Sequence, residues 1–366
     1  MIQELMLNFY LVSIFILISS FLTVYYIIPR ISWVITNKKL NDEPNNRSSH
    51  TTAIPTMAGI SFFFTLIFTI FFIQYFDEDH IGLNLIASST LILMVGVKDD
   101  LVLSTPKMKL IIEALAIMFL FFNSTMEATS LHGFLGIYEI PEIVAYLGSV
   151  LIALTIINSY NLIDGIDGLA AAIGIVVSTI FGVIFYTANQ QFYFILCLSL
   201  IGMLSAYLIY NFSPKKKIFM GDTGSLLIGF CLAFLTLKFI TLEASNYDSL
   251  GIKLENALVM VLAILCIPLF DLLRVIGVRL LNKKSPFLPD RNHAHHILIK
   301  NGISHFRASA LLVLLNIVIV TLCIWLSFTF ESEMMLFFLL MIFCLYLVLF
   351  NVLRKKSNQN LISDSK

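Results

Sequence analysis

Long apolar runs recur along almost the whole of this 366-residue sequence. A helix needs about 20 mostly apolar residues to cross a lipid bilayer, and somewhat fewer when one of its ends is buried in protein. By that rule there are eleven candidate segments: Leu7–Ile28, Thr56–Tyr75, Leu83–Val97, Leu110–Phe122, Ile143–Ile157, Leu169–Tyr186, Phe192–Tyr210, Leu226–Ile240, Ala257–Val278, Ala308–Phe328 and Met334–Val352. We therefore predict an all-α polytopic membrane protein with eleven transmembrane helices.

The composition supports this class. Hydrophobic residues make up 58% of the chain and charged residues 13%, which would leave a soluble protein of this length with too little polar surface. Lys and Arg together number 23, as do Asp and Glu, so the formal net charge is zero. A surface that binds nucleic acid needs a basic excess, and we therefore expect no nucleic-acid partner.

The distribution of basic residues predicts the orientation. Lys and Arg concentrate in cytoplasmic connections near the ends of membrane helices. With the N-terminus outside, only Lys238 and Lys253 fall on the outer side. We therefore predict an external N-terminus, a cytoplasmic C-terminus and one transmembrane domain over residues 1–356, followed by a polar cytoplasmic tail at 357–366.

An acidic pair lies at the predicted inner end of the third apolar segment. Asp99 and Asp100 follow Lys98, and Lys107 and Lys109 precede the next segment. Adjacent carboxylates at a membrane edge repel each other, so they need a cation, a lysine or solvent to stay ionised. The pattern indicates either a polar site or a solvated loop that stops the helix.

Four polar side chains recur every third residue at the inner end of the fifth segment: Asn158, Asn161, Asp164 and Asp167. This spacing keeps them roughly on one side of a helix end. Gly165 and Gly168 permit tight turns and close approach of the backbone to a ligand. A capped helix terminus is the alternative, but it does not explain so many polar groups near lipid, where they are costly.

The stretch Phe219–Ser225 stands directly before the eighth segment. Its glycines and hydroxyl residues leave backbone N–H groups free at a helix start, where the helix dipole favours a phosphate. The P-loop pattern is absent, so an ATPase is excluded at the level of the motif. Asp222 suits a magnesium ligand, because Mg²⁺ takes one or two protein carboxylates together with phosphate oxygens.

A basic stretch connects the ninth and tenth segments, and it contains Arg291, His293, His295 and His296. Three histidines within four residues are one possible zinc site, yet no Cys or carboxylate stands at a familiar zinc spacing around them. Because a guanidinium group binds phosphate in a two-pronged way, a loop that grips a diphosphate is the better interpretation.

These four blocks, in this order, resemble the polyprenyl-phosphate N-acetylhexosamine-1-phosphate transferase family, which is glycosyltransferase family 4. The resemblance runs from about Pro44 to Gly302 and is carried by the following stretches: Met57–Ile60, Asp99–Asp100, Asn158–Leu169, Phe219–Ser225 and Pro289–His296. The last stretch looks most like the undecaprenyl-phosphate N-acetylglucosamine-1-phosphate branch, which starts O-antigen, teichoic acid and related glycans.

The resemblance implies an activity and its partners. The expected reaction transfers N-acetylhexosamine-1-phosphate, with GlcNAc-1-phosphate as the expected group, from a UDP-sugar to undecaprenyl phosphate and releases UMP. Mg²⁺ is the expected cofactor, with Mn²⁺ as the alternative metal. The resemblance also implies a bacterial inner membrane protein with its active site on the cytoplasmic face. A homodimer is compatible with it.

The resemblance also implies roles at matching positions. Asp222 would be the metal ligand, while Asp99 and Asp100 would orient or deprotonate the acceptor phosphate. The residues expected at the uridine end are Asn161, Asp164, Asp167, Asn211 and Phe219, with Asn158 as a further substrate-binding residue. The residues expected to hold the diphosphate and sugar are Lys109, Arg291, His293, His295 and His296. Such a mixture suits phosphoryl transfer, which depends on positioning and on neutralising charge.

Two other functions stay open at this point. The muramyl-pentapeptide branch of the same family performs the same chemistry on a larger donor. A secondary transporter would place acids on broken helices near the membrane midplane and would show repeat symmetry. The sequence shows no internal repeat, and the acids stand at the predicted inner ends of the helices.

Overall fold

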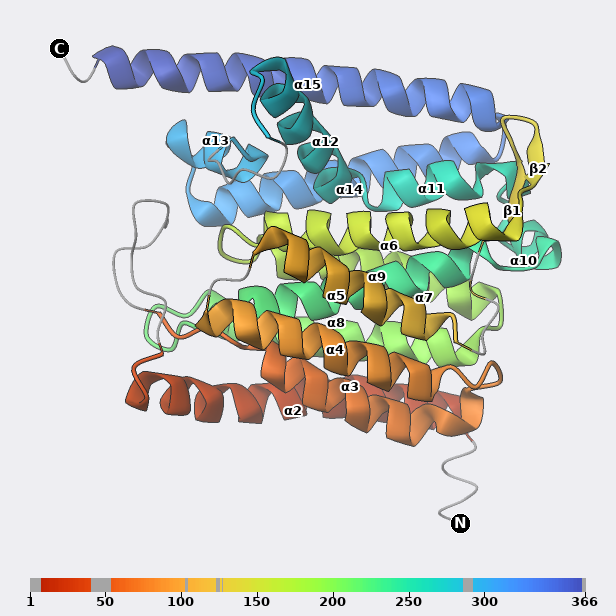
Figure 1. Cartoon of the computed structure of the whole chain (residues 1–366), viewed down its shortest axis with the longest axis horizontal. Helices are drawn as coiled ribbons and strands as arrows, with labels where there is room; N and C mark the ends of the chain where they lie inside the picture. Colours follow the sequence, from red (N-terminus) through yellow and green to blue (C-terminus); the bar gives the residue numbers. More distant parts are fainter. Residues whose placement is uncertain are drawn as a thin grey trace.

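The computed structural model of the chain describes residues 8–40, 54–102, 105–122, 126, 128–285 and 292–363, with side chains up to Ser357. Most of its helices run side by side along one direction (Figure 1). The elements of the first half are α2 (Phe9–Asn37), α3 (Gly59–Ile73), η1 (Gln74–Phe76), α4 (Gly82–Leu101), α5 (Pro106–Leu120), β1 (Ser130–Phe134), β2 (Ile137–Glu139), α6 (Glu142–Ile163) and α7 (Leu169–Thr187).

The second half continues the bundle. Its elements are α8 (Gln191–Asn211), α9 (Gly221–Ile240), α10 (Ala244–Leu250), η2 (Leu254–Asn256), α11 (Ala257–Ile264), α12 (Cys266–Leu281), α13 (Ala294–Lys300), α14 (His305–Ser327) and α15 (Ser332–Ser363). Because α15 runs to Ser363, the predicted tail boundary at residue 357 lies within a helix.

Each of the eleven predicted segments coincides with a helix or a helix pair. Within the described residues, nine helices are long and apolar enough to cross a membrane, and η2–α11 with α12 forms a tenth, bent candidate. The remaining segment is α5, which has 15 residues and is shorter than a full span. The structure therefore supports an all-α polytopic membrane protein, with fewer full-length spans than the sequence predicts.

A small β-hairpin was not predicted from the sequence. Strands β1 and β2 pair antiparallel between α5 and α6, with Ser130 opposite Glu139 and Phe134 opposite Ile137. The tight turn between them includes Gly136 at a φ of 77°. Two such short strands, without strong alternation, give too weak a pattern to stand out in the sequence.

Helix α9 forms the centre of the bundle. Of its most apolar 18-residue window, 94% is buried inside the protein, whereas the corresponding share for α15 is 17%. Helices α3, α4, α6, α7 and α11 all pack against α9. A helix that is apolar all round is typical of such a buried position, whereas Gly221 and Asp222 in its first turn stay partly exposed.

The span formed by α11 and α12 is broken at Leu265, where the two helices meet at an angle of 73°. Within lipid, backbone groups freed by a break need partners from protein. Asn316 of α14 supplies them, because its amide nitrogen donates to the Ile264 carbonyl at 3.2 Å and its oxygen accepts from the Ile267 N–H at 3.4 Å. The break turns α12 away from the common direction of the bundle (Figure 1).

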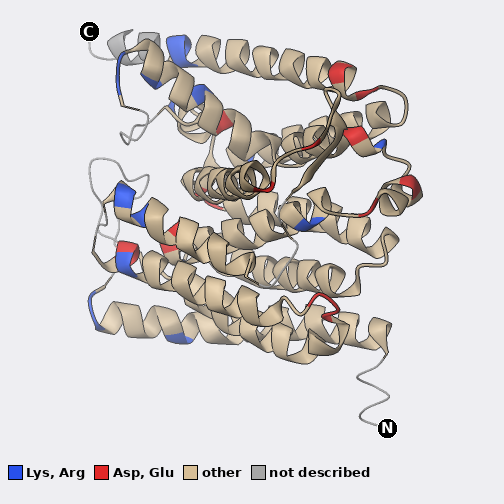
Figure 2. Cartoon of the chain, turned by 45° about the vertical axis from the view of Figure 1, so that its right-hand side comes forward, with Lys and Arg blue, Asp and Glu red and all other residues tan. Residues whose placement is uncertain are grey.

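Charged side chains separate along the bundle. Lys and Arg gather toward one end of the helices, while Asp and Glu prevail in the connections at the other end (Figure 2). The ends of α4 and α6 and the starts of α5 and α9 lie at the basic end (Figure 1). This arrangement agrees with the charge distribution from which the orientation was predicted, and the orientation itself stays a prediction.

Candidate active site

Lys109 joins two of the predicted site residues. Its Nζ lies 3.1 Å from Asp99 Oδ2 and 2.6 Å from Asp222 Oδ2. The side chains of Lys109 and Asp99 are each 14% exposed and that of Asp222 is 31% exposed. Helices α4, α5 and α9 thus contribute one charged residue each to a partly buried cluster, in which a single ammonium group faces two carboxylates.

Asn161 connects α6 to the same cluster. Its amide nitrogen donates to Asp222 Oδ1 at 2.9 Å and to Ser225 Oγ at 2.7 Å. The two oxygens of Asp222 therefore have different partners, Lys109 on one and Asn161 on the other. Four of the predicted residues, which stand far apart in the sequence, are thus linked in series from Asp99 through Lys109 and Asp222 to Asn161.

Asp100 has different hydrogen-bond partners from its neighbour Asp99. Its Oδ1 accepts from the Asp222 N–H at 2.8 Å, and its Oδ2 accepts from the Thr223 N–H at 3.0 Å and from the Thr223 hydroxyl. A carboxylate at a helix start satisfies free N–H groups and complements the helix dipole. Asp100 therefore caps α9 from α4 and fixes Asp222, while Asp99 is the member of the pair that contacts Lys109.

Close backbone contacts hold α3 and α4 against the first turn of α9. A Cβ atom on Gly59 would lie 2.2 Å from the Gly224 nitrogen, and one on Gly96 would lie 2.5 Å from the Thr223 Cα. Only glycine permits such an approach. The glycines therefore set the distance at which the Asp100 carboxylate reaches the start of α9.

Asn158 makes hydrogen bonds to residues other than those of this cluster. Its amide nitrogen donates to Glu113 Oε2 at 2.6 Å and to the Leu154 carbonyl at 2.9 Å. Glu113 lies on α5, one turn beyond Lys109, and is fully buried. The repeat of three thus places Asn158 and Asn161 on one helix with different partners, and Asn158 ties α6 to α5.

Asp164 ends α6 and is partly buried. Burial, followed by the nearby carboxylates of Asp222 and Asp100, raises the pKa of Asp164 to about 8. Both causes act in the same direction, because burial and neighbouring negative charges each disfavour the ionised carboxylate. Cations or bound donors near the site would oppose this effect, because they favour the ionised form.

Asp167, in the turn that follows, is an ion-paired residue. Its Oδ2 lies 2.6 Å from Lys217 Nζ and 3.2 Å from His305 Nδ1. Burial acts to raise the pKa of Asp167, but the hydrogen bonds from His305 and Lys217 hold it below the ordinary value. The surroundings therefore shift the pKa values of two aspartates of one motif in opposite directions.

Asn211 holds the same turn in place. The Gly168 N–H donates to Asn211 Oδ1 at 2.6 Å, and Asn211 Nδ2 donates to Tyr207 OH at 2.8 Å and to the Ile218 carbonyl at 3.1 Å. Gly168 has a φ of 77°, which suits glycine. Buried Asn211 thus uses its amide to join the turn to the segment before α9, which is a positioning role.

Phe219 lies in that segment, half-buried at the basic end. Its N–H donates to the Pro55 carbonyl at 2.9 Å, and its carbonyl accepts from the Ala58 N–H at 3.3 Å. Lys217 Nζ stands 5.5 Å from the centre of the Phe219 ring. The two hydrogen bonds therefore fix the backbone of Phe219, and the ammonium group of Lys217 lies near its ring.

The histidines approach the Asp164–Asp167 turn from a separate element. His293 N-caps α13, and its ring lies 5.7 Å, centre to centre, from that of His295, which in turn is 4.3 Å from that of His296. A Cβ on Gly165 would lie 2.2 Å from His295 Nε2, so this imidazole packs directly on the turn. Burial, then the neighbouring His296, lowers the pKa of His295. Arg291 lies outside the described residues.

Two carboxylates of the cluster fit a hard metal ion. Mg²⁺ prefers oxygen ligands and usually takes one or two carboxylates with phosphate oxygens and water. Asp222 and Asp99 supply such oxygens around a shared positive group, the ammonium of Lys109. Within the part of the chain that the structure describes, no group of three or more His, Cys, Asp or Glu residues is arranged for a metal. Asp222 would thus hold the ion together with substrate oxygens.

Comparison with known proteins identifies the family. The sequence model of glycosyl transferase family 4 matches residues 83–240, which include the cluster of Asp99, Lys109, Asn161 and Asp222. A probable undecaprenyl-phosphate N-acetylglucosaminyl 1-phosphate transferase of Bacillus subtilis (strain 168) is 31% identical over 319 residues, which are 85% of this chain and 86% of that protein. The chain belongs to glycosyl transferase family 4.

Two further relatives of this glycosyl transferase carry closely similar names. The undecaprenyl-phosphate alpha-N-acetylglucosaminyl 1-phosphate transferase of Yersinia pestis is 31% identical over 279 residues, covering 75% of this chain and 73% of that protein. The protein of the same name from Escherichia coli (strain K12) is 30% identical over 279 residues, which again cover 75% of this chain and 73% of that protein. The family predicted from the four motif blocks is therefore confirmed.

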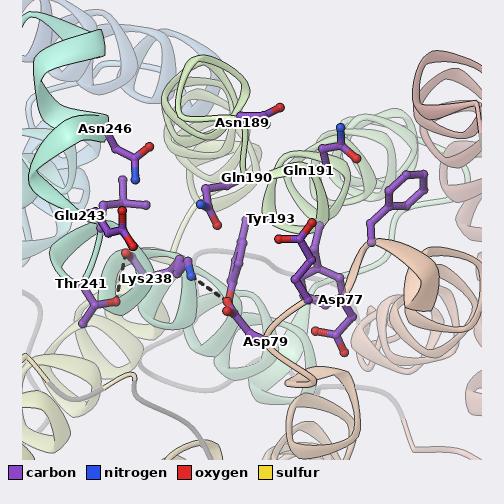
Figure 3. Close-up of a pocket in the computed structure, with 14 residues that line it drawn as sticks. Asp77, Asp79, Asn189, Gln190, Gln191, Tyr193, Lys238, Thr241, Glu243 and Asn246 are labelled. Atoms are coloured by element: carbon purple, nitrogen blue, oxygen red, sulfur yellow. Dashed lines mark hydrogen bonds and ion pairs between the residues drawn. The ribbon is translucent and has the colours of Figure 1, made fainter.

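A polar pocket of about 400 Å³ lies at the opposite end of this glycosyl transferase (Figure 3). None of the predicted site residues that the structure describes lines it. At its floor, Lys238 Nζ lies 2.6 Å from Asp79 Oδ2, which also accepts from Tyr193 OH at 2.6 Å. These contacts explain why a lysine is tolerated at the predicted outer end of α9, and they tie α9 to α8.

Three charged residues near the site escaped the sequence analysis as functional candidates: Glu113, Asp271 and Arg274. Each is almost fully buried within an apolar helix of this glycosyl transferase. A lone ionisable residue in a membrane helix is costly and points to a functional partner. The charged residues stand out in the sequence, but their partners do not. Asn158 lies 45 residues from Glu113, and His293 lies 22 residues from Asp271.

Proposed function

We propose that this enzyme transfers N-acetylglucosamine-1-phosphate, or a closely related N-acetylhexosamine-1-phosphate, from a UDP-sugar to undecaprenyl phosphate. UMP is the second product, and the lipid-linked sugar diphosphate starts a cell-surface glycan. The observation that carries the proposal is the cluster of Asp99, Lys109, Asn161 and Asp222 in a chain whose relatives are named for this transfer.

The reaction brings two anions together. An oxygen of the lipid phosphate attacks the sugar-linked phosphorus of the donor, a new P–O bond forms, and the bond from that phosphorus to the UMP oxygen breaks. Catalysis of phosphoryl transfer is mainly positioning and neutralisation of charge. A bound Mg²⁺ would supply part of this neutralisation.

Residues of the chain itself contribute to the positioning of the phosphates and to the neutralisation of their charge. Lys109 places a positive charge between Asp99 and Asp222, next to the position expected for the phosphates. Asn161 holds the second oxygen of Asp222, so that this carboxylate keeps one orientation. Preorganised groups of this kind cost no rearrangement when charge develops in the transition state.

The proposed uridine end lies beside this cluster. Phe219 offers an aromatic face for the base, and the turn between Asp164 and Asp167 borders it through Lys217, which contacts both Asp167 and Phe219. His295 packs on this turn at Gly165, which supports a role for the histidines next to the donor. Arg291 is proposed to grip the diphosphate.

We also propose that the basic end faces the cytoplasm of a bacterium, with the N-terminus outside. The gathering of Lys and Arg at the end that holds the cluster supports this orientation (Figure 2). Such an orientation gives the site access to UDP-sugars, which are soluble and cytoplasmic, and to a lipid phosphate at the membrane surface.

The test mixes purified protein in lipid nanodiscs with undecaprenyl phosphate, Mg²⁺ and one donor at a time. The donors are UDP-GlcNAc, UDP-GalNAc and UDP-muramyl-pentapeptide. UMP release is measured together with the mass of the lipid product. We expect transfer from UDP-GlcNAc or its epimer, none from the muramyl donor, and loss of transfer when the metal is chelated.

The outcomes separate the alternatives. Transfer from UDP-muramyl-pentapeptide alone would assign the chain to the other branch of the family and refute the sugar assignment. No UMP release with any donor, by protein whose melting curve shows that it is folded, would refute the proposed reaction. Asp248→Asn, an exposed position at the opposite end, is the matched control for loss of a carboxylate.

A further inference from the structure

A buried pair of opposite charges stands beside the histidines. Asp271 and Arg274 lie one turn apart on α12, with Arg274 Nη2 2.7 Å from Asp271 Oδ1, and their side chains are 3% and 0% exposed. Removing charges from water is costly, and such a pair persists only when further hydrogen bonds satisfy it. Residues 292–294 supply further hydrogen bonds to both members of the pair, and the Arg274 guanidinium also stands 5.6 Å from the centre of the Phe350 ring.

Asp271 and Arg274 hold the start of α13 at three points. Asp271 Oδ2 lies 2.8 Å from His293 Nδ1, and Asp271 Oδ1 accepts from the Ala294 N–H at 2.9 Å. Arg274 Nη2 donates to the Asn292 carbonyl. A carboxylate that accepts from the first N–H of a helix caps that helix. Here the carboxylate belongs to α12 and the capped helix is α13.

The carboxylate also determines the orientation of the His293 ring. An ionised carboxylate accepts, so His293 Nδ1 carries a hydrogen and the ring is left with Nε2 as its second polar atom. The ring of His293 stacks near that of His295, which packs on Gly165. Asp271 therefore contacts His293, the His293 ring stacks on that of His295, and His295 packs on the turn between Asp164 and Asp167. A shift of Asp271 would move both imidazoles relative to this turn.

The position of Asp271 depends in turn on the broken span. Without the bend at Leu265, α12 would continue along α11, and Asp271 would not reach α13. Asn316 stabilises the bend by satisfying the freed backbone groups, and it is fully buried. The break, the charged pair and the histidines form one chain of contacts.

We propose that Asp271 is a positioning residue for the transfer reaction, which sets the His293–His295 pair over the donor side of the site, with Arg274 as its charge partner. The inference rests on the proposed function for its kinetic consequence, since the histidines are expected to hold the sugar diphosphate. Its structural content, the capping of α13 by Asp271, is independent of that function.

The first arm of the test measures structure without activity. The amides of residues 293–300 are followed by hydrogen exchange in the full-length protein in nanodiscs, for wild type, Asp271→Asn and the control Asp248→Asn. Asparagine keeps the size of the side chain but presents an N–H₂ group where a second accepting oxygen is needed. We expect exchange in this segment to rise roughly tenfold or more in Asp271→Asn, because a charge-assisted hydrogen bond is lost, with the rest of the bundle unchanged.

The second arm separates positioning from general destabilisation. A misplaced histidine pair raises the KM for the UDP-sugar, whereas partial unfolding lowers kcat and leaves both KM values unchanged. We expect a donor KM at least about tenfold higher in Asp271→Asn, from loss of about one charged hydrogen bond, and a KM for undecaprenyl phosphate within about twofold of wild type. In a His293→Gln background, the further change Asp271→Asn should have little additional effect on the donor KM.

Several results would overturn the proposal. These are unchanged exchange at residues 293–300 in Asp271→Asn, a uniform increase throughout the bundle, or additive effects of the two substitutions on the donor KM. Should Asp271→Asn not fold, a smaller local increase is expected in His293→Gln, which loses the contact with Asp271 Oδ2 but keeps the Ala294 bond, and no increase would refute the fixing of His293 by Asp271. Should the wild type transfer no sugar, the proposed function fails, while the exchange arm still decides the role of Asp271.

Discussion

Replacement of Gly96 by alanine tests the packing that fixes the Asp222 carboxylate. The added Cβ would lie 2.5 Å from the Thr223 Cα and 2.8 Å from the Thr223 nitrogen, both of them backbone atoms. Ordinary carbon contacts need about 3.5 Å or more. Helices α4 and α9 must therefore separate by about 1 Å at this point, since neither backbone can move aside alone.

The displacement has a local consequence for the site. Asp100, one turn from Gly96, accepts from the Asp222 and Thr223 N–H groups at 2.8 and 3.0 Å, and a shift of about 1 Å breaks at least one of these bonds. Overpacking typically destabilises by about 1–3 kcal/mol. A misplacement of about 1 Å near reacting groups can also lower the rate by about 100-fold.

The assay compares Gly96→Ala with Gly148→Ala, because a Cβ on Gly148 would meet no atom within 4 Å. Both variants gain the same methyl group within a helix, so their difference isolates the contact with α9. Thermal melting in nanodiscs reports the stability, and UMP release reports the activity. A Gly96→Ala protein that melts and turns over like Gly148→Ala would refute the reasoning that this contact sets the position of Asp222.

Three further predictions address charge, topology and pH. Asp222→Asn should abolish most UMP release and weaken its Mg²⁺ dependence, whereas Asp248→Asn should do neither; near-normal turnover of Asp222→Asn at low Mg²⁺ would refute the metal role. A cysteine introduced near Lys216 should react only with reagents that reach the cytoplasm, and one near Asp248 only from outside; the reverse pattern would invert the orientation. Although burial opposes it, hydrogen bonds from Lys238 and Tyr193 lower the pKa of Asp79, so its contribution to stability is present above about pH 4 and is lost as the pH falls through the folded-state pKa. The melting difference between wild type and Asp79→Asn should therefore shrink in acid, and a constant difference would contradict the ion pair.

The helices and the family were within reach of the sequence, because both depend on local signals. Apolar runs of the right length need no knowledge of tertiary contacts, and each predicted segment coincides with helical structure. The four polar blocks were also predicted to lie at one side of the membrane. The structure brings Asp99, Lys109, Asn161 and Asp222 together at one end of the helix bundle.

The hydrogen-bond partners of these residues could not be predicted, because they belong to helices that are far apart in the sequence. Successive residues of a helix point about 100° apart, so Asp99 contacts α5 while Asp100 caps α9. The repeat of three likewise does not reveal that Asn158 faces Glu113 and Asn161 faces Asp222. The short α5 and the bend at Leu265 depend on neighbouring helices that satisfy polar groups, as Asn316 does.

Helix α9 carries Asp222 near one end and Lys238 near the other, 16 residues apart by their numbers. At about 1.5 Å per residue, these charges are separated by about 24 Å, against a hydrocarbon thickness of about 30 Å. The helix is fixed at both ends, by Asp100 at one and by Asp79 at the other, so it cannot slide along its axis. Because α9 is enclosed by other helices, the lipid meets the outer helices of the bundle, and we expect the bilayer around the whole protein to thin toward the distance between the two charged ends of α9.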